Sequence, residues 1–545
     1  MPDKPSPAAS HGYQPRHGRE TFFIEGEGLV GSPAAVKAVS ARPRGRARAA
    51  AVVPDFRFSR MGPRGTRLQR GIRRKVAAAI SAGGRDPVGR IPAGYTYLGQ
   101  FVDHDLTFDA TTVTLGVNVS PADLLQGRSP TLDLDSLYGA GPNDPVSAEF
   151  YEDDRHLKFG KTVRVDNLRA RREYDLARVG DGSRRRPRRA LIPDFRNDEN
   201  LAVAQTHLAF IRFHNRVVDG LDSSVPARRR FRVARSEVIK HYQWMLRHDY
   251  LPRICDRAVV KDVFDNGRKV HEAGADPLTM PTMPVEFSVA AFRMGHSMIR
   301  ATYDWNAEFP GRGGALFFLF DFSGTSGGLG GDELALPSNW IADWRRLYDF
   351  ASIGRPDLKP PPGARNLARR IDTRLAPPLS DLPPGSFGGS FDDFGKLVAD
   401  LAFRNLARAT MVKLASGQQM AQLLRSKGVP VTTLTRRQIL GGVADSGGAV
   451  LDALTDGERD SFAKATPLWF YVLREAELND GRLTGVGARI VAETFHRAME
   501  GSRHSILRDP DWRPTLGAVD NRFTMTDLLL VAYDNDKDVL APLGD

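Results

Sequence analysis

The sequence predicts a mainly α-helical fold, and two observations lead to this prediction. Apolar residues recur at the helical period over 201–218, and further helical segments are indicated over about 391–414, 417–426, 435–440, 456–478, 484–500 and 525–532. No alternation of strands and helices indicates a parallel sheet. Helices are therefore expected to form most of the folded chain.

Length and composition fit a soluble globular protein. The chain has 545 residues, of which 41% are hydrophobic and 26% are charged, so it is long enough for one large domain or several. The longest apolar block, Ala315–Phe320, is too short to span a bilayer, and the N-terminus lacks the apolar core of a secretory signal. We expect no transmembrane segment and either a cytoplasmic or an unconventionally secreted protein. The single cysteine, Cys255, excludes intramolecular disulfides and thiolate metal clusters.

Charge is unevenly distributed along the chain, whose net charge is +12. Residues 155–189 carry most of the excess, which peaks in the basic run Arg184–Arg189. Such a stretch could bind an anionic surface, but no aromatic residues interleave the run, so a solvated loop is favoured and no specific nucleic acid is expected. Residues 1–50, rich in Pro, Ala, Gly and Arg, are expected to form an extended arm before a folded domain over 51–545.

The segment Tyr95–Asp109 is the most informative stretch. In a helix, Gln100, Asp103 and His104 share one face, whereas Asp105 lies about 100° further round. An amide, a carboxylate and an imidazole are costly to bury together without partners, which indicates a site. A single histidine satisfied by a neighbouring acid is the alternative.

Acids and hydroxyls alternate shortly after this segment, at Ser129, Thr131, Asp133 and Asp135. Hard oxygen ligands at short spacing suit calcium, although the run is not an EF-hand. An ordinary Asx-type turn is the other interpretation. Because Asp105 needs a separate role, calcium is preferred.

Two further segments carry polar pairs at one-turn spacing. Arg196 and Glu199 stand at the start of the helix over 201–218, and Arg293 and His296 lie in a helix expected over Pro281–Tyr303. Two pairs of histidines spaced by seven residues, His207/His214 and His241/His248, are expected to lie on packed or solvated faces. A divalent-metal hydrolase using His104-Asp105 and His248-Asp249 is an alternative, but it gives the arginines no role.

These segments resemble motifs of the animal-type haem peroxidases, the peroxidase–cyclooxygenase superfamily. GQFVDHDLTF is similar to the distal-histidine motif, RNDENLAVAQTHLAFIRFHNR to the catalytic-arginine helix, and AFRMGHSMIR to the proximal-histidine helix. The block 400–418 resembles the later helix that supports the proximal ligand. Together these motifs cover about residues 90–420 in the family's order, and the arrangement is most similar to bacterial single-domain members.

The resemblance implies a large single helical domain with haem b between the distal and proximal helices. It assigns peroxide chemistry to the distal side, where His104 would be the acid–base, Arg196 would stabilise charge on the departing oxygen and Gln100 would orient peroxide. It makes His296 the axial iron ligand, supported by Asn405. The remaining implied roles are haem propionate partners for Arg293 and Arg408, ester bonds to haem for Asp103 and Glu199, and calcium ligands for Asp105, Ser129, Thr131, Asp133 and Asp135.

The function implied is a peroxidase that reduces H2O2 and oxidises halides or small aromatic donors through a high-valent iron-oxo haem. Asn200 stands where some members carry a methionine joined to haem, so that link is not expected. Arg293 stands where lipid oxygenases of the superfamily carry a radical-forming tyrosine, which favours a peroxidase. Adhesion to an anionic matrix through the basic stretch 155–189 could coexist with this activity.

Overall fold

The structure is a computed structural model, and it describes residues 56–83, 87–109, 117–124, 126–165, 168, 174–181, 188–331, 333–383, 399–443 and 448–545. The expected N-terminal arm over 1–50 and positions 184–187 of the basic run lie outside the described residues. Most of a strand-like piece expected over 112–119 lies outside them too, and its described end, 117–119, forms no strand.

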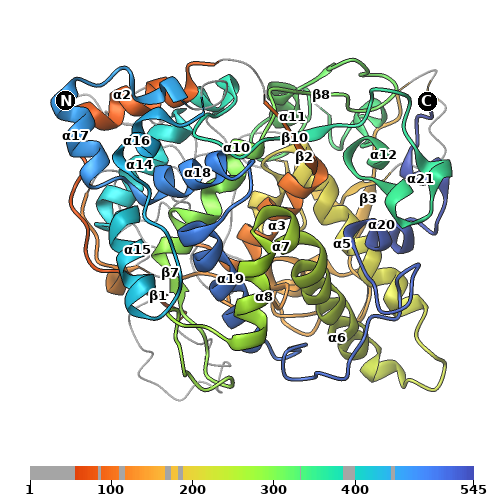
Figure 1. The fold of residues 1–545 in the computed structure, drawn as a ribbon. Coiled ribbons are helices and arrows are strands. Elements are labelled where there is room, and N and C mark those ends of the chain that lie inside the picture. The colour runs from red at the N-terminus through yellow and green to blue at the C-terminus, as the bar shows by residue number, and fades with distance from the viewer. Residues whose placement is uncertain are drawn as a thin grey trace, which may run out of the picture.

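Helices dominate the described residues, so the mainly α-helical prediction is confirmed (Figure 1). Strands occur there only as five short pairs: β1 (Phe58–Ser59) with β7 (Met283–Pro284), β2 (Val88–Pro92) with β10 (Leu367–Arg369), β3 (Phe159–Lys161) with β4 (Tyr174–Leu176), β5 (Arg178–Val179) with β6 (Arg189–Ala190), and β8 (Thr302–Tyr303) with β9 (Gly314–Ala315). The longer helices are α2 (Arg70–Ser81), α3 (Gly94–Leu106), α5 (Leu201–Asp219), α6 (Ala227–Met245), α8 (Arg257–Asn266), α14 (Leu401–Met411), α15 (Gly417–Ser426), α17 (Asp456–Lys464), α18 (Leu468–Leu478), α19 (Gly485–Glu500) and α20 (Met525–Ala532). None of the helices in the described part combines the length and apolar character needed to cross a bilayer.

Helix α3 lies near the centre of the molecule, beside α5 (Figure 1). The two helices meet through stacked rings of Phe101 and Phe210, whose centroids are 4.3 Å apart. On another side of α3, a methyl group at Gly99 would lie 2.3 Å from the hydroxyl oxygen of Tyr250. Glycine at this position therefore allows the tyrosine to approach the helix backbone closely.

The segment that carries Arg196 and Glu199 precedes α5 instead of forming its first turn. It is a short 3-10 turn, η3 (Phe195–Asp198), capped by Asp194, whose carboxylate accepts from the backbone N–H of Arg196. The side chain of Asn200 then caps α5 by accepting from the N–H of Val203. Two successive caps explain why the chain turns here before the long helix begins.

The expected continuous helix over 281–303 is wrong, because the structure breaks it into three pieces. These are α9 (Val285–Ser288), the 3-10 turn η5 (Ala291–Met294) and α10 (Gly295–Met298). Ala290 has φ −134° and ψ −73°, which interrupts the helical hydrogen bonds. Side chains take over the freed carbonyl groups: Arg293 Nε donates to Ser288 O at 2.7 Å, and Trp469 Nε1 donates to Arg293 O at 3.3 Å.

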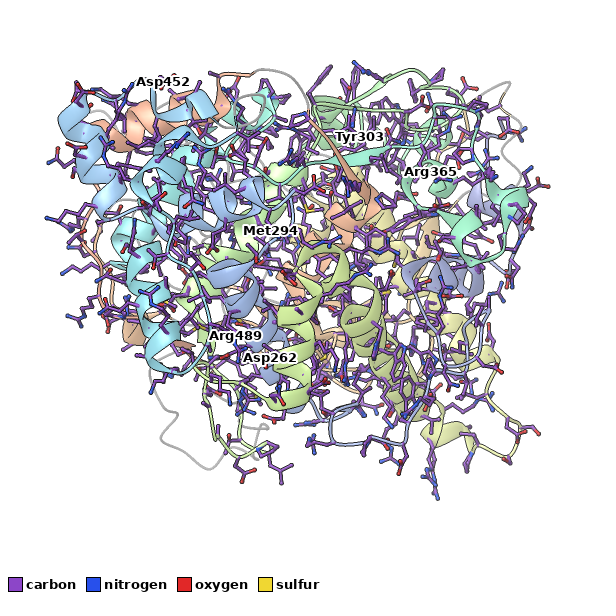
Figure 2. The ribbon with its side chains drawn as sticks, viewed as in Figure 1. Asp262, Met294, Tyr303, Arg365, Asp452 and Arg489 are labelled. Carbon is purple, nitrogen blue, oxygen red and sulfur yellow. The ribbon has the colours of Figure 1, made fainter. Side chains whose placement is uncertain are left out.

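The C-terminal half follows the predicted helices with two corrections. Of the helix expected over about 391–414, positions 391–398 lie outside the described residues, and α14 begins only at Leu401 because Asp400 has an extended backbone and caps it. Helices α15, α19 and α20 agree with the predicted segments to within a residue, and α16 (Arg436–Gly441) is displaced by one residue. The segment 456–478 is instead split into α17 and α18 at Pro467, which lacks the N–H that would continue a helix. Helix α19 is anchored to α8 by an ion pair between Arg489 and Asp262, labelled in Figure 2.

Candidate active site

A cavity of about 1260 Å³, its open mouth included, lies between the segments that carry the predicted site residues. Met294, labelled near the middle of Figure 2, is one of its lining residues. Its lining includes seven of the residues predicted from the sequence: Gln100, Asp103, His104, Arg196, Glu199, Arg293 and His296. Aromatic and aliphatic side chains cover much of the remaining wall, among them Phe108, Phe195, Phe292, Leu316, Phe320, Leu379 and Leu401. The structure therefore brings the separated motifs together around one space.

His104 is buried in α3 and is held at one ring nitrogen. Its Nδ1 lies 2.9 Å from Oδ1 of Asn197, and its Nε2 lies 3.6 Å from Oε1 of Glu199, which is too far for a hydrogen bond. Burial, followed by the charge of Arg196, lowers the pKa of His104 to about 3. This value lies below that of a free imidazole, because the ring is desolvated beside a guanidinium group.

Arg196 is fixed by a carboxylate that it shares with another arginine. Its Nε and NH2 groups donate to Asp194 at 3.0 and 2.7 Å, and NH2 also donates to the backbone carbonyl of His104 at 2.9 Å. Arg128, which is buried, donates from Nε to the same carboxylate at 2.9 Å. Burial alone would raise the pKa of Asp194, but the two guanidinium groups outweigh it and hold this pKa well below its usual range. The network gives Arg196 one fixed position at the cavity wall.

Gln100, Glu199 and Asn200 form a hydrogen-bonded row beside His104. The amide nitrogen of Gln100 donates to Glu199, and the amide nitrogen of Asn200 donates to Oε1 of Gln100 at 2.9 Å. Asp103, one residue before His104, forms an ion pair with NH1 of Arg293 at 3.2 Å. Both carboxylates that the family resemblance links to haem therefore face the cavity.

His296, at the start of α10, lines another part of the cavity. Its Nδ1 lies 2.9 Å from the amide nitrogen of Asn405 on α14, which matches the predicted pairing of these two side chains. Because an amide presents an oxygen and an NH2 group of similar shape, the same contact suits either tautomer of the ring.

Arg408 is placed differently from its predicted role. It is absent from the cavity lining, where Arg404, one turn earlier on α14, stands instead. Arg408 forms an ion pair at 2.7 Å with Asp109, which does line the cavity. The sequence could not indicate this pairing, because the two residues are 299 positions apart.

Of the predicted calcium residues, Ser129, Thr131, Asp133 and Asp135 lie in an acidic loop that ends at α4 (Asp135–Tyr138) and contacts Asp105 of α3. Asp105 is buried and accepts from the Ser136 hydroxyl at 3.0 Å, while Asp135 accepts from the Ser129 N–H at 3.0 Å. The hydroxyls of Ser129 and Thr131 contact each other, and Thr131 donates to Asp133 at 2.7 Å.

The carboxylates of Asp105 and Asp135 are buried close to each other, so their negative charges are unfavourable. Oxygen Oδ1 of Asp135 is buried without a hydrogen-bond partner. Burial, and next the charge of Asp135, raise the pKa of Asp105 well above its usual value. Even so, no cluster of three or more His, Cys, Asp or Glu side chains with metal-binding geometry occurs in the described part of the chain.

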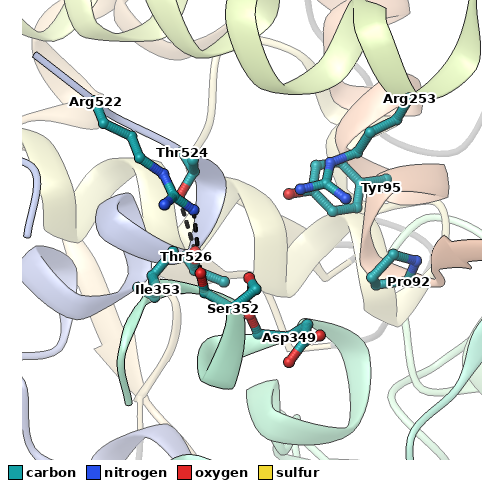
Figure 3. Close-up of a pocket in the computed structure, with 9 residues that line it drawn as sticks. All are labelled: Pro92, Tyr95, Arg253, Asp349, Ser352, Ile353, Arg522, Thr524 and Thr526. Carbon is teal, nitrogen blue, oxygen red and sulfur yellow. Dashed lines mark hydrogen bonds between the residues drawn. The ribbon is translucent and has the colours of Figure 1, made fainter. Parts of the chain in front are cut away.

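The residues of the hydrolase alternative have other partners. Asp249 accepts from the Tyr95 hydroxyl at 2.6 Å and from Arg253 Nε at 2.7 Å, and the ring of His248 stacks on that of Trp244. Figure 3 shows Arg253 beside Tyr95 at the edge of a small polar pocket, with the guanidinium 4.4 Å from the ring centre. These contacts tie Asp249 to a structural ion pair.

The comparisons with known proteins agree with this geometry. The sequence pattern of the animal haem peroxidase family matches residues 109–312, which include Arg196, Glu199 and His296. Thyroid peroxidase of Rattus norvegicus is 27% identical over 187 residues, which are 33% of this chain and 20% of that protein. Residues 109–312 are therefore part of an animal haem peroxidase domain.

Two solved structures share the fold of this chain. Peroxidase A from Dictyostelium discoideum superimposes with a TM-score of 0.55 at 16% identity, covering 83% of this chain and 88% of that one. A fatty acid alpha-dioxygenase of Arabidopsis thaliana does so with a TM-score of 0.53 at 15% identity, covering 83% and 73%. The match to the curated peroxidases spans about a fifth of their length.

Several residues of the site were not predicted from the sequence. Asp194, Asn197, Arg128, Asp109 and Arg404 received no specific role, although each contacts a predicted residue or lines the cavity. A signal existed for Asp194, because an aspartate directly before a short turn often caps it. Arg128 and Asp109 meet their partners through long-range contacts, for which one sequence offers no signal.

Proposed function

We propose that the protein is a haem peroxidase that reduces H2O2 and oxidises halides or small aromatic donors. The observation that carries the proposal is the single cavity lined by His104, Arg196 and His296, three side chains from three separate segments. An imidazole base, a fixed guanidinium and a second imidazole are the groups that cleavage of peroxide at an iron centre requires.

The residues around the cavity fit haem. The imidazole of His296 suits iron, and its contact with Asn405 would orient the ring and tune its donor strength. The guanidinium groups of Arg293 and Arg404 at the cavity wall suit the cofactor's carboxylates, and the aromatic lining suits its macrocycle. Haem held in this way would supply the oxidising equivalents of the reaction.

The polar residues beside His104 would handle the protons of peroxide. Nε2 of His104 would take a proton from the near oxygen and return it to the far oxygen, so that water leaves. Arg196, held by Asp194, would stabilise the negative charge that develops on the departing oxygen without having to reorganise. Gln100, braced by Glu199 and Asn200, would orient the peroxide.

An absorption spectrum before and after a small excess of H2O2 tests this function. We expect the purified protein, supplemented with haem where needed, to show a Soret band that changes when peroxide is added. A protein that shows no Soret band even after supplementation would overturn the proposal.

Two ester bonds would join the haem to Asp103 and Glu199, the carboxylates of the family motif that line the cavity. After brief treatment with peroxide, acidified organic solvent should therefore leave haem on the protein. A variant that combines Asp103→Asn with Glu199→Gln should release it under the same conditions. Complete extraction of haem from the parent protein would contradict the ester links.

Calcium would occupy the acidic loop of Asp105, Ser129, Thr131, Asp133 and Asp135. The buried Oδ1 of Asp135, which has no hydrogen-bond partner, and the raised pKa of Asp105 support a cation there, because a cation would offset the charge of both buried carboxylates. A cation held at 100 times its Kd stabilises a fold by about 2.7 kcal/mol.

Removal of this cation should therefore destabilise the protein measurably. For a chain of this size, we expect EGTA to lower Tm by about 3 °C. The variant Asp135→Asn should be insensitive to EGTA, and calcium added back should restore only the parent. An unchanged Tm for the parent in EGTA would argue against the cation.

Binding to an anionic surface through the basic stretch stays a prediction. Of the described residues at its end, Arg188 donates to the carbonyl of Gly331 at 2.7 Å and Arg189 pairs with Glu149 at 3.3 Å. These contacts tie that end to the protein itself.

A further inference from the structure

Two contacts in series join the ring of His104 to a second histidine buried behind it. Nδ1 of His104 lies 2.9 Å from Oδ1 of Asn197, and Nδ2 of Asn197 lies 3.0 Å from Nδ1 of His207. All three side chains are buried, and two of them, Asn197 and His207, are fully inaccessible. The proposed function uses neither of these two.

The amide of Asn197 couples the proton positions of the two rings. Its oxygen can only accept a hydrogen bond and its NH2 group can only donate one. With NH2 turned toward His207, Nδ1 of His207 must accept, so the proton of that ring is on Nε2. With the oxygen turned toward His104, Nδ1 of His104 must donate, so its Nε2 carries the lone pair. Reversing the amide would reverse both rings.

The coupling matters because each neutral ring has one proton to place. Both rings are buried, and burial favours the neutral form of an imidazole. The carboxylate oxygen of Glu199, 3.6 Å from Nε2 of His104, would attract a proton to that nitrogen. A proton on Nε2 would prevent this nitrogen from taking a proton from peroxide. The contact between Nδ1 and Oδ1 of Asn197 opposes this, because it keeps the ring proton on Nδ1.

We propose that Asn197 and His207 are positioning residues that keep the proton of His104 on Nδ1, leaving Nε2 as a proton acceptor in the cavity. His207 acts by accepting from the NH2 group of Asn197, which keeps the amide oxygen turned toward His104. The second nitrogen of His207 has no hydrogen-bond partner in the described structure, and its ring meets that of Phe101 edge to face at 5.7 Å. The effect on peroxide cleavage rests on the proposed function, whereas the proton position does not.

The proton positions can be measured directly on the full chain without cofactor. Long-range ¹H–¹⁵N spectra of protein labelled with [¹⁵N]histidine distinguish the two neutral tautomers, and the signals are assigned by their loss in His104→Gln and His207→Gln. At pH 7 we expect the proton of His104 on Nδ1 and that of His207 on Nε2. The reverse arrangement, or the same tautomer in both rings, would overturn the proposal.

Variants then test the part played by His207. His207→Phe removes the acceptor, so the amide is free to turn and the reaction with peroxide should slow by about 10–100-fold. His207→Gln offers an amide oxygen in its place and should restore much of the parent rate. In an Asn197→Asp background the same His207→Phe change should have little effect. A carboxylate can only accept a hydrogen bond, so it keeps the proton of His104 on Nδ1 whether or not His207 is present.

The two proposals fail in different ways. If no variant and not even the parent reacts with peroxide, the proposed function is wrong, while the spectra still decide the proton positions. If the parent reacts and His207→Phe reacts equally fast with an unchanged His104 tautomer, the positioning role of His207 is wrong and the peroxidase function stands.

Discussion

Replacing His104 by glutamine should slow the reaction with H2O2 by about 10²–10⁴-fold, the usual contribution of a positioned general base. Glutamine can still contact Asn197 but cannot take a proton from peroxide. Haem should remain bound, because His296 lies on a different segment of the cavity wall. Stopped-flow absorption of the haem band after mixing with peroxide measures the rate without a second substrate.

A matched control is His248→Gln, since this histidine packs on Trp244 and is absent from the cavity lining. It should react at the parent rate. The pKa of His104 is about 3, so its ring stays unprotonated between pH 7 and pH about 5. The parent should therefore lose no rate when the solution is acidified over this range. If His104→Gln reacted as fast as the parent, the base would have to be another residue.

Replacing His296 by alanine should remove haem binding, which is a larger effect than any change in rate. The imidazole is the iron ligand in the proposed function. Among the described residues that line the cavity, His104 is the one other histidine, and it has a different role. Titration of the purified protein with haem, followed by the Soret band, measures the loss. Added imidazole should restore part of the band by filling the space left by the side chain.

Asn405→Leu is the graded counterpart of this change. This variant keeps His296 but removes the amide that lies 2.9 Å from Nδ1 of His296, so haem affinity should fall by about 10–100-fold. A parent-like haem titration for His296→Ala would show that the cofactor is held elsewhere, and the assignment of this cavity wall would be wrong.

The sequence predicted the fold well where burial follows a helical period. Helices α5 and α19 are buried over most of their length, so their apolar pattern is strong and their bounds agree with the predictions to within a residue. The pattern failed at Pro467 and Ala290, where the backbone departs from helical geometry while apolar residues continue at similar spacing. Periodicity reports which side chains are buried, and it does not report a break between two buried pieces.

The candidate site was predicted in part for a similar reason. Asp103 and His104 are adjacent, and Arg196 and Glu199 are three residues apart, so the spacing within each pair and its likeness to a family motif are visible in the sequence. Their supports come from elsewhere: Arg128 reaches Asp194 across 66 positions. Such contacts depend on how the helices pack, which local spacing does not encode.

The close approach of Tyr250 to Gly99 sets a rule for reshaping the cavity, since both residues line it. Any side chain at position 99 would compete with the tyrosine hydroxyl for the same volume. A mutant library that varies only one of the two positions would mainly sample either clashes or voids. Varying them as a pair, with a smaller residue at 250 allowing a larger one at 99, would move the boundary of the cavity while leaving His104 and Arg196 unaltered. The two positions thus behave as one adjustable unit for protein engineers who wish to change which donors can enter.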